Sequence, residues 1–340
     1  MSAAGRVGRM ILGSTLAIVT IAPSSRAAGA TAPIPAAPPA APPVHAVKVT
    51  ILSTMLAGDA GGGIGEWGFS AVVEADGHTI LYDTGARPNT VMTNARELGV
   101  DLSGITDVVL SHYHDDHTGG LLTLRRELLK ANPTALSRTH VATGIFLSRR
   151  ESGSEHEANS MIALRPEYEA TGGRFEESAG PAEIFPGVWL TGPVPRTYPE
   201  HNVSGHAQIP TAAGPKDDDI PEDQSLVADA EGGLVVVSGC AHAGIVNTLE
   251  YAERRIRKGP VQALIGGFHL FPADDRTLDW TAGKLRELNV LNILGAHCTG
   301  IEALFHLREG AGLTRKTAVV GAVGATYTTG KGIDPRLLAR

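Results

Sequence analysis

Cysteine and long apolar runs are both scarce in this sequence of 340 residues. Only two cysteines occur, Cys240 and Cys298, which excludes the multiple-disulfide framework of small secreted domains. The longest apolar-rich stretch covers residues 10–22 and is too short to span a bilayer comfortably. Basic residues are also outnumbered, 29 against 36 acidic ones, and they form no run. This acidic balance argues against nucleic acid as a partner.

The first thirty residues have the layout of a secretory signal peptide. Arg6 and Arg9 precede the apolar stretch, and small residues at 27–30 follow it. Residues 31–46 are rich in alanine and proline, which predicts an extended linker. We therefore expect a signal peptide at 1–30 and one folded domain at 47–340. The mature protein is expected in a periplasm or outside the cell, free of the membrane after cleavage; a retained membrane anchor is the alternative.

Strand and helix patterns alternate in two blocks along the expected domain. Strands are predicted over apolar or alternating runs at 47–56, 68–74, 78–83, 106–110, 140–146, 224–229, 233–238, 261–270, 291–296 and 318–323. Helices are predicted at 89–98, 121–128, 245–256, 277–288 and 302–307. A charged, glycine-punctuated stretch at about 148–182 predicts an insertion that is helical near 160–169. Two such blocks predict an α/β fold of four layers, helix–sheet–sheet–helix, with the site at one edge.

Three histidines and two aspartates crowd into six positions after the strand predicted to end at Leu110. The segment 111–120 reads SHYHDDHTGG. Side chains alternate on extended backbone, so His112 and His114 point the same way. Asp116 and His117 follow in the turn before a helix, where they are placed to hold a second metal. Neutral imidazole with carboxylate suits zinc, iron or manganese, so the cluster predicts a centre of one or two divalent ions.

Three more histidines follow predicted strands, next to glycine turns. His242 comes two residues after Cys240, and His297 directly precedes Cys298. His269 ends a strand at the same expected edge, where it is a candidate to contact substrate or donate a proton; a buried structural histidine is the alternative. Because each cysteine lies beside a histidine, we expect metal-site or buried thiols. A disulfide is the alternative in an oxidising compartment.

The motif H-x-H-x-D-H at 112–117 resembles the signature of the metallo-β-lactamase superfamily. Four further segments resemble one branch of it, the dihydropterin–ribofuranosylaminobenzene-phosphate synthases, often described as metal-dependent hydrolases; they lie at 223–226, 239–247, 266–270 and 297–300. The resemblance covers about 47–330. The sequence departs from the branch at Trp67, where the branch tends to have histidine. Because Trp67 is outside the expected ligand set, this departure affects the inferred substrate more than the inferred metal binding.

The resemblance implies particular roles at the site. Asp83 would orient the histidine loop through hydrogen bonds, and His297 would be the last metal ligand. Cys240 stands where most members carry an aspartate that bridges two metals, so either Cys240 or His242 is the ligand after this strand. The usual third-histidine motif is missing, although His201 and His206 fall in its window.

The combined ligand set predicts two ion sites. His112, His114 and His242 would hold one ion, and Asp116, His117 and His297 the other. Asp116 would also orient the attacking water or take its proton. The leading function is a metal-dependent hydrolase, with zinc as the expected metal, that attacks a small ester, phosphoester or lactone-like molecule. The alternatives are a transferase of the synthase type named above, and an exported metal-containing binding or sensor protein without turnover.

Overall fold

The computed structural model of the protein describes residues 42–60, 62–200, 202 and 207–339. The expected signal peptide and nearly all of the expected linker therefore lie outside the described residues. Among the helices that are described, none combines the length and the apolar character needed to cross a membrane.

Eight strands form the first sheet. They are β1 (Val47–Ser53), β2 (Ser70–Ala75), β3 (His78–Tyr82), β4 (Asp107–Val109), β5 (Arg138–Ala142), β7 (Arg174–Ser178), β17 (Thr326–Thr328) and β18 (Gly332–Asp334). Their order is β18-β17-β1-β2-β3-β4-β5-β7, with parallel pairing from β3 to β7 and antiparallel pairing elsewhere. Asp76 and Gly77 join β2 to β3 with φ of 45° and 87°, the left-handed backbone that a two-residue hairpin turn requires.

Seven strands form the second sheet. They are β8 (Ala182–Phe185), β9 (Val188–Leu190), β12 (Ser225–Ala230), β13 (Gly233–Ser238), β14 (Val261–Gly266), β15 (Ile293–Gly295) and β16 (Ala318–Val320). The order is β16-β15-β14-β13-β12-β9-β8, and β13 to β16 run parallel. Parallel strands end at the same edge of a sheet, so the residues that follow β13, β14 and β15 come together there.

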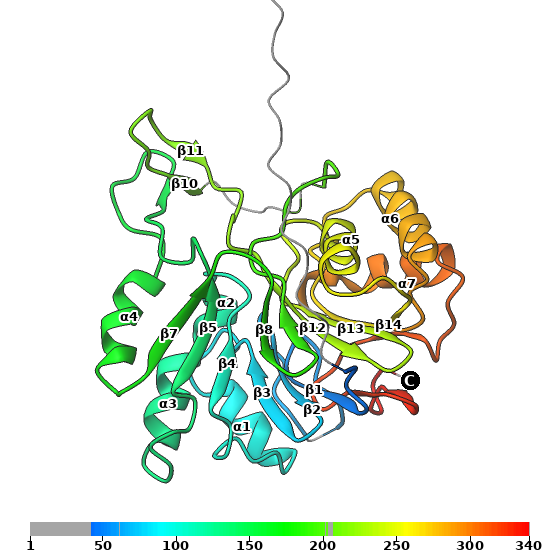
Figure 1. Ribbon diagram of the computed structural model, residues 1–340, viewed down its shortest axis with the longest axis horizontal. Helices are drawn as coiled ribbons and strands as arrows, with labels where there is room; N and C mark the ends of the chain where they lie inside the picture. Colours follow the sequence, from blue (N-terminus) through cyan, green and yellow to red (C-terminus); the bar gives the residue numbers. More distant parts are fainter. Residues whose placement is uncertain (1–41, 61, 201, 203–206, 340) are drawn as a thin grey trace, which may run out of the picture. The chain divides into compact units, whose positions relative to one another are not determined.

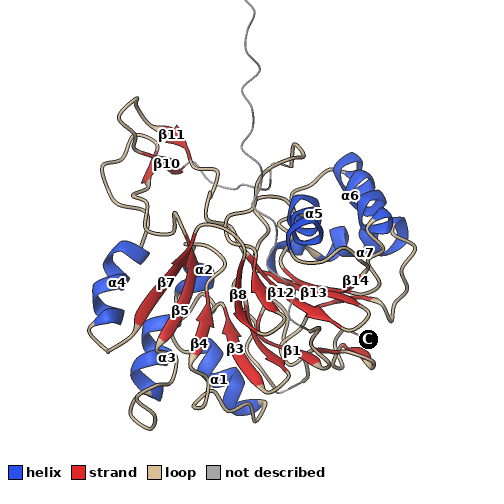
Figure 2. Ribbon diagram, viewed as in Figure 1, coloured by secondary structure: helices blue, strands red, loops and turns tan. Residues whose placement is uncertain are grey.

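The two sheets pack face to face, and helices cover their outer faces (Figures 1 and 2). Side chains from both sheets, among them Ile51 and Val237, form the core between them. The first sheet is covered by α1 (Thr90–Glu97), α3 (Leu121–Leu128) and α4 (Met161–Glu169). The second is covered by α5 (Ile245–Arg255), α6 (Asp275–Glu287) and α7 (Ile301–Gly310). The predicted four-layer fold is confirmed.

The stretch at 148–182 differs from the insertion that the sequence predicted. It does contain a helix near 160–169, which is α4, and β6 (Arg150–Glu151) joins a small third sheet with β10 (Ala207–Ile209) and β11 (Lys216–Asp217). However, β7 pairs in parallel with β5 and completes the edge of the first sheet. Its sequence, RFEES, has one apolar residue and the charged character common at sheet edges, which hid the strand from pattern analysis.

Candidate metal centre

The histidine loop begins where β4 ends and is pressed against the turn after β3. His114 is extended and is the N-cap residue of a short helix, α2 (Asp115–Thr118). The glycines that follow leave no room for a side chain. A Cβ on Gly119 would lie 2.1 Å from the carbonyl oxygen of Ala86, and one on Gly120 would lie 2.2 Å from that of Thr84. The SHYHDDHTGG segment therefore needs both glycines to dock in this position.

Asp83 lies behind the loop, fully buried and in left-handed backbone with φ of 52°. Its carboxylate accepts hydrogen bonds from the Ser111 N–H at 2.7 Å and the Ser111 hydroxyl at 2.8 Å. It also lies 2.7 Å from Nδ1 of His117. With Nδ1 held this way, Nε2 of His117 carries the free lone pair and faces the other donors.

Asp83→Asn is expected to weaken divalent-ion binding by about 10–100-fold. The asparagine amide would present an N–H to Nδ1 of His117, which favours the tautomer whose Nε2 is protonated and cannot bind a metal. Competition with a chromophoric chelator measures the affinity. Asp107→Asn is the matched control, because Asp107 is also buried but pairs with Arg138 and His140 at the start of β4. Equal affinities in both variants would contradict this role for Asp83.

The first predicted trio, His112, His114 and His242, is brought together by the ends of β4 and β13. Nε2 of His112 lies 2.9 Å from Nδ1 of His114 and 3.2 Å from Nε2 of His242. Nδ1 of His242 contacts the Asn202 carbonyl oxygen. Burial and the neighbouring imidazoles hold the pKa of His112 and His242 well below the usual value and lower that of His114 to about 4. These rings are neutral at physiological pH, which is the metal-binding form.

The second predicted trio, Asp116, His117 and His297, has the opposite electrostatics. Oδ2 of Asp116 lies 3.2 Å from Nε2 of His297 and 3.8 Å from Nε2 of His117. Burial alone would raise the pKa of Asp116, but His117 and His297 hold it below its usual value. Burial likewise opposes charge on His297, yet Cys298 and Asp116 raise its pKa to about 10. This part of the site favours positive charge.

Cys240 lies between the two trios. Its Sγ is 3.1 Å from Nε2 of His117 and 3.2 Å from Sγ of Cys298. Both cysteines are free and buried, so the structure has the thiol pair and not the disulfide. The preceding residue must be glycine, since a Cβ on Gly239 would lie 2.2 Å from the Ser111 hydroxyl.

His269 completes the wall of histidines at this edge. Its ring centroid lies 4.6 Å from that of His242, and neither ring nitrogen has a hydrogen-bond partner although the side chain is buried. Nδ1 of His297 is likewise buried without a partner. Both histidines have left-handed backbone, with φ of 49° and 46°. Strained backbone of this kind clusters at functional sites.

These residues fit a divalent metal centre. The ligand atoms of each predicted trio lie within 4.8 Å of one another, and Cys240 joins further such groups with His112 and His117, and with His297 and Cys298. Imidazole, carboxylate and thiol are the donors that zinc prefers. Orphaned ring nitrogens in a buried site also need a partner that the described protein atoms do not supply. His201 and His206, the other two candidates, lie outside the described residues.

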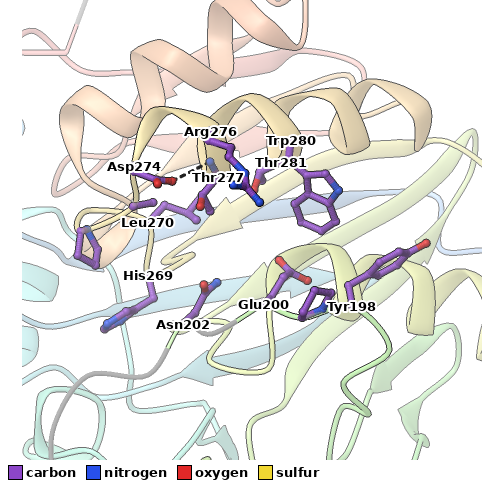
Figure 3. A pocket seen from close by; sticks show the side chains of 13 residues that line it. Tyr198, Glu200, Asn202, His269, Leu270, Asp274, Arg276, Thr277, Trp280 and Thr281 are labelled. Carbon is purple, nitrogen blue, oxygen red and sulfur yellow. Dashed lines mark hydrogen bonds between the residues drawn. The ribbon is translucent and has the colours of Figure 1, made fainter.

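A cavity of about 680 Å³ opens beside His269 (Figure 3). Tyr198 and Glu200 line it from one side, and Arg276 and Trp280 of α6 line it from the other. Burial raises the pKa of Glu200 to about 7 despite two backbone N–H donors. Sequence analysis missed these lining residues, because they come from distant segments that share no motif.

Two exposed aromatic residues flank the donor atoms. Trp67 is 50% exposed and Phe271 is 48% exposed, and their ring centroids are 5.4 Å apart in an edge-to-face contact. The ring of Trp67 also lies 4.9 Å from that of His297. Trp67, the position that departs from the resembling branch, therefore lies at the exposed edge of the donor cluster.

The sequence profile of the metallo-beta-lactamase superfamily matches residues 68–256, more than half of the chain, and the protein belongs to this superfamily. Membership implies divalent-metal binding. A similar protein is the 7,8-dihydropterin-6-methyl-4-(beta-D-ribofuranosyl)-aminobenzene-5'-phosphate synthase of Methanocaldococcus jannaschii. It is 29% identical over an alignment of 271 residues, which covers 76% of this chain and 90% of that one. A crystal structure described as a metal-dependent hydrolase of the beta-lactamase superfamily is 27% identical with a TM-score of 0.62, covering 78% of this chain and 93% of that one.

Proposed function

We propose that this protein is a metal-dependent hydrolase that uses activated water to cleave a small ester, phosphoester or lactone-like substrate. The observation that carries the proposal is the meeting of two donor trios at one edge of the sandwich. His112, His114 and His242 would hold one ion, and Asp116, His117 and His297 the other. Zinc suits this donor set best, ahead of iron or manganese. A bound ion of this kind supplies Lewis acidity and lowers the pKa of a coordinated water to about 7.

Asp116 is suited to handle the proton of the attacking water. Its side chain is 22% exposed, whereas those of His117 and His297 are fully buried. Its lowered pKa keeps it ionised at neutral pH, so the carboxylate can accept a hydrogen bond from water and orient it. This role requires Asp116 to have one oxygen toward solvent while the other faces His297.

His269 is suited to act on the substrate. It lies both beside His242 and in the wall of the 680 Å³ cavity, with its ring nitrogens free of protein partners. From there it could hydrogen-bond the substrate or donate a proton to the leaving group. Trp67 and Phe271 form an exposed aromatic pair beside His297, which favours a small molecule with a flat or apolar part.

A second candidate is a transferase that joins an aminobenzene-type nucleophile to an activated pterin. The similarity to the Methanocaldococcus jannaschii synthase favours it, because the same donors could stabilise a departing diphosphate. Release of diphosphate from a pterin diphosphate would support the transferase, and hydrolysis of esters without such release would support the hydrolase.

We also propose export of the mature protein. Arg6 and Arg9, the apolar stretch at 10–22 and the small residues at 27–30 are the support. Export suits a hydrolase better than the transferase, since activated pterins are made and used in the cytoplasm. Cell fractionation with N-terminal sequencing of the mature chain tests this: an intact Met1 in the cytoplasmic fraction would overturn it.

His114→Ala is expected to abolish activity and remove the ion of the first trio, because only two imidazoles would remain there. Elemental analysis and a hydrolysis panel of esters, phosphodiesters and lactones measure the two effects. His45→Ala is the control. His45 is an exposed histidine that pairs with Glu231, and neither residue belongs to the donor groups. Metal retained at full stoichiometry in His114→Ala would refute the ligand assignment.

A further inference from the structure

The cavity beside His269 reaches from the donor cluster along α6. Figure 3 shows His269 at one end of it and Tyr198 with Trp280 at the other. Arg276 projects from α6 into the space between them. His269 is 6% exposed, and neither of its ring nitrogens has a partner among the described residues. A buried polar group without a protein partner indicates a ligand, so this cavity has the features of a binding site.

The described lining contains two carboxylates, and each is already engaged by the start of a helix. Oδ1 of Asp274 accepts a hydrogen bond from the Thr277 N–H at 2.9 Å as the N-cap of α6. The carboxylate of Glu200 accepts the N–H groups of Val246 and Asn247, 3.2 and 2.8 Å away, in the first turn of α5. These donors and the positive dipole ends of the two helices offset both negative charges.

Arg276 is the cationic side chain of this lining, and it has no such partner. It forms no hydrogen bond or ion pair with any described residue, and its charge affects Asp274 only through space. A guanidinium binds a carboxylate through two parallel N–H···O bonds. A dianionic phosphate suits the position less well, because a single cation would face two negative charges in a wall that also holds two acidic side chains.

The end of the cavity remote from His269 is aromatic. The rings of Tyr198 and Trp280 meet edge to face, with their centroids 5.6 Å apart. The Tyr198 hydroxyl donates to Glu250, which is outside the lining, so the hydroxyl is already satisfied and the ring remains to contact a ligand. Aromatic walls of this kind bind flat rings through stacked or edge-to-face contacts.

We propose that this cavity recognises an aromatic carboxylate as the part of the substrate that does not react. Arg276 pairs with the carboxylate, and the rings of Tyr198 and Trp280 contact the aromatic ring. The bond to be cleaved then lies at the His269 end, beside the donor cluster. The proposal deepens the proposed function and rests on it, because it names the substrate class that the hydrolase selects. Arg276 is a specificity-determining residue that takes no part in bond cleavage.

Calorimetric titration of the metal-loaded full chain with naphthoate and with naphthamide tests the binding site. The two probes share one ring system, and the first alone carries a carboxylate. We expect naphthoate to bind about tenfold more tightly, the usual contribution of a hydrogen-bonded pair with charged partners. Naphthyl phosphate is the third probe. Equal affinity for the acid and the amide, or tighter binding of the phosphate, would overturn the proposal.

Matched variants then locate the carboxylate. Arg276→Gln should abolish the preference for naphthoate over naphthamide, and Trp280→Leu should weaken both probes by a similar factor. Arg286→Gln is the control, because Arg286 is an exposed arginine of the same helix that does not line the cavity. A preference that persists in Arg276→Gln would place the carboxylate elsewhere, such as on a bound ion, and would contradict the assignment. Circular dichroism confirms that each variant is folded.

Inhibition kinetics separate this proposal from the proposed function. Naphthoate should raise the KM of the best substrate in the hydrolysis panel and leave kcat unchanged. Arg276→Gln should relieve the inhibition about tenfold, whereas Arg286→Gln should retain it. Hydrolysis that naphthoate does not inhibit competitively would remove the cavity from substrate recognition and leave the hydrolase intact. Selective binding of naphthoate by a protein that hydrolyses no member of the panel would instead overturn the proposed function.

Discussion

Replacing Asp116 by asparagine is expected to lower kcat by about 10²–10⁴-fold, the usual contribution of a positioned general base. Asparagine keeps the size of the side chain but removes its charge and its ability to accept a proton. The same change weakens the second trio, since the close contact with His297 loses its charge. The measurement is kcat on the best substrate of the hydrolysis panel, with metal content determined in parallel.

Asp115→Asn is the matched control for this prediction. Asp115 is the neighbouring residue in the same motif, but its carboxylate hydrogen-bonds the hydroxyl of Ser160 and belongs to none of the donor groups. Activity close to that of the unsubstituted protein is expected. Full activity and full metal content in Asp116→Asn, or an equal loss in Asp115→Asn, would remove Asp116 from the proposed chemistry.

Arg149→Met is expected to destabilise the fold by about 3–5 kcal/mol, the usual consequence of breaking a buried ion pair. The guanidinium is fully buried, pairs with Asp218 at 2.8 Å and with Glu222, and stacks 3.9 Å from the ring centroid of Tyr113. Methionine fills much of the volume but leaves two buried carboxylates without their cation. Urea unfolding of the metal-free protein measures the free energy of unfolding.

The loss should grow with pH. Burial already raises the pKa of Glu222 to about 7, against the influence of Arg149, and removing Arg149 raises it further. A carboxyl group whose folded pKa is raised contributes stability at low pH that is lost as pH rises toward that pKa. Because the folded pKa of Glu222 is about 7 in the unsubstituted protein, this group lowers the stability of both proteins in parallel below that pH. Above about pH 7 the variant, whose folded pKa is higher, should continue to lose stability while the unsubstituted protein levels off.

Two further variants separate this effect from a general effect of losing arginine. Arg150→Met removes a neighbouring arginine whose ion pair with Glu155 is exposed, and a change below about 1 kcal/mol is expected. Adding Glu222→Gln to Arg149→Met should recover part of the stability and flatten the pH dependence. A stable Arg149→Met with an unaltered pH profile would contradict this account.

The sequence predicted the elements whose patterns are long and apolar. The strands β12 and β13 and the helices α5 and α6 lie close to their expected positions, because each buries a regular set of apolar side chains. Short strands were missed instead. β17 and β18 have three residues each, and they return the chain to the first sheet beside β1. Their conformation depends on pairing with a strand that is distant in sequence, and their own residue pattern does not mark them as strands.

The donor residues were predictable for a related reason. His112 to His117 form one dense segment, and Cys240, His242 and His297 each follow a strand at a glycine turn. Parallel pairing of β13 to β15 then brings the later segments to a common edge. No local signal marks the lining of the cavity, because Tyr198 and Trp280 meet only through the packing of the loop before β10 against α6.

The left-handed backbone at Asp83, His269 and His297 was also beyond pattern analysis, since glycine usually marks such positions. In these residues the conformation is imposed by the surroundings. Asp83 is held by Ser111 and His117, and the N–H of His297 donates to the Thr54 hydroxyl at 2.9 Å. Tertiary contacts therefore determine the orientation of these side chains.

The donor atoms come from the carboxyl ends of strands in both sheets, His112 to His117 after β4 and Cys240 to His297 after β13 to β15. Cations held there would link the two sheets of the sandwich at one edge. They would join chain segments more than a hundred residues apart, as a cross-link that closes a long loop does. Folding and metal supply thus become thermodynamically linked, since binding to the native state adds RT ln(1 + [M]/Kd) to its stability. Scarcity of the metal would therefore lower the stability of the native state as well as the activity.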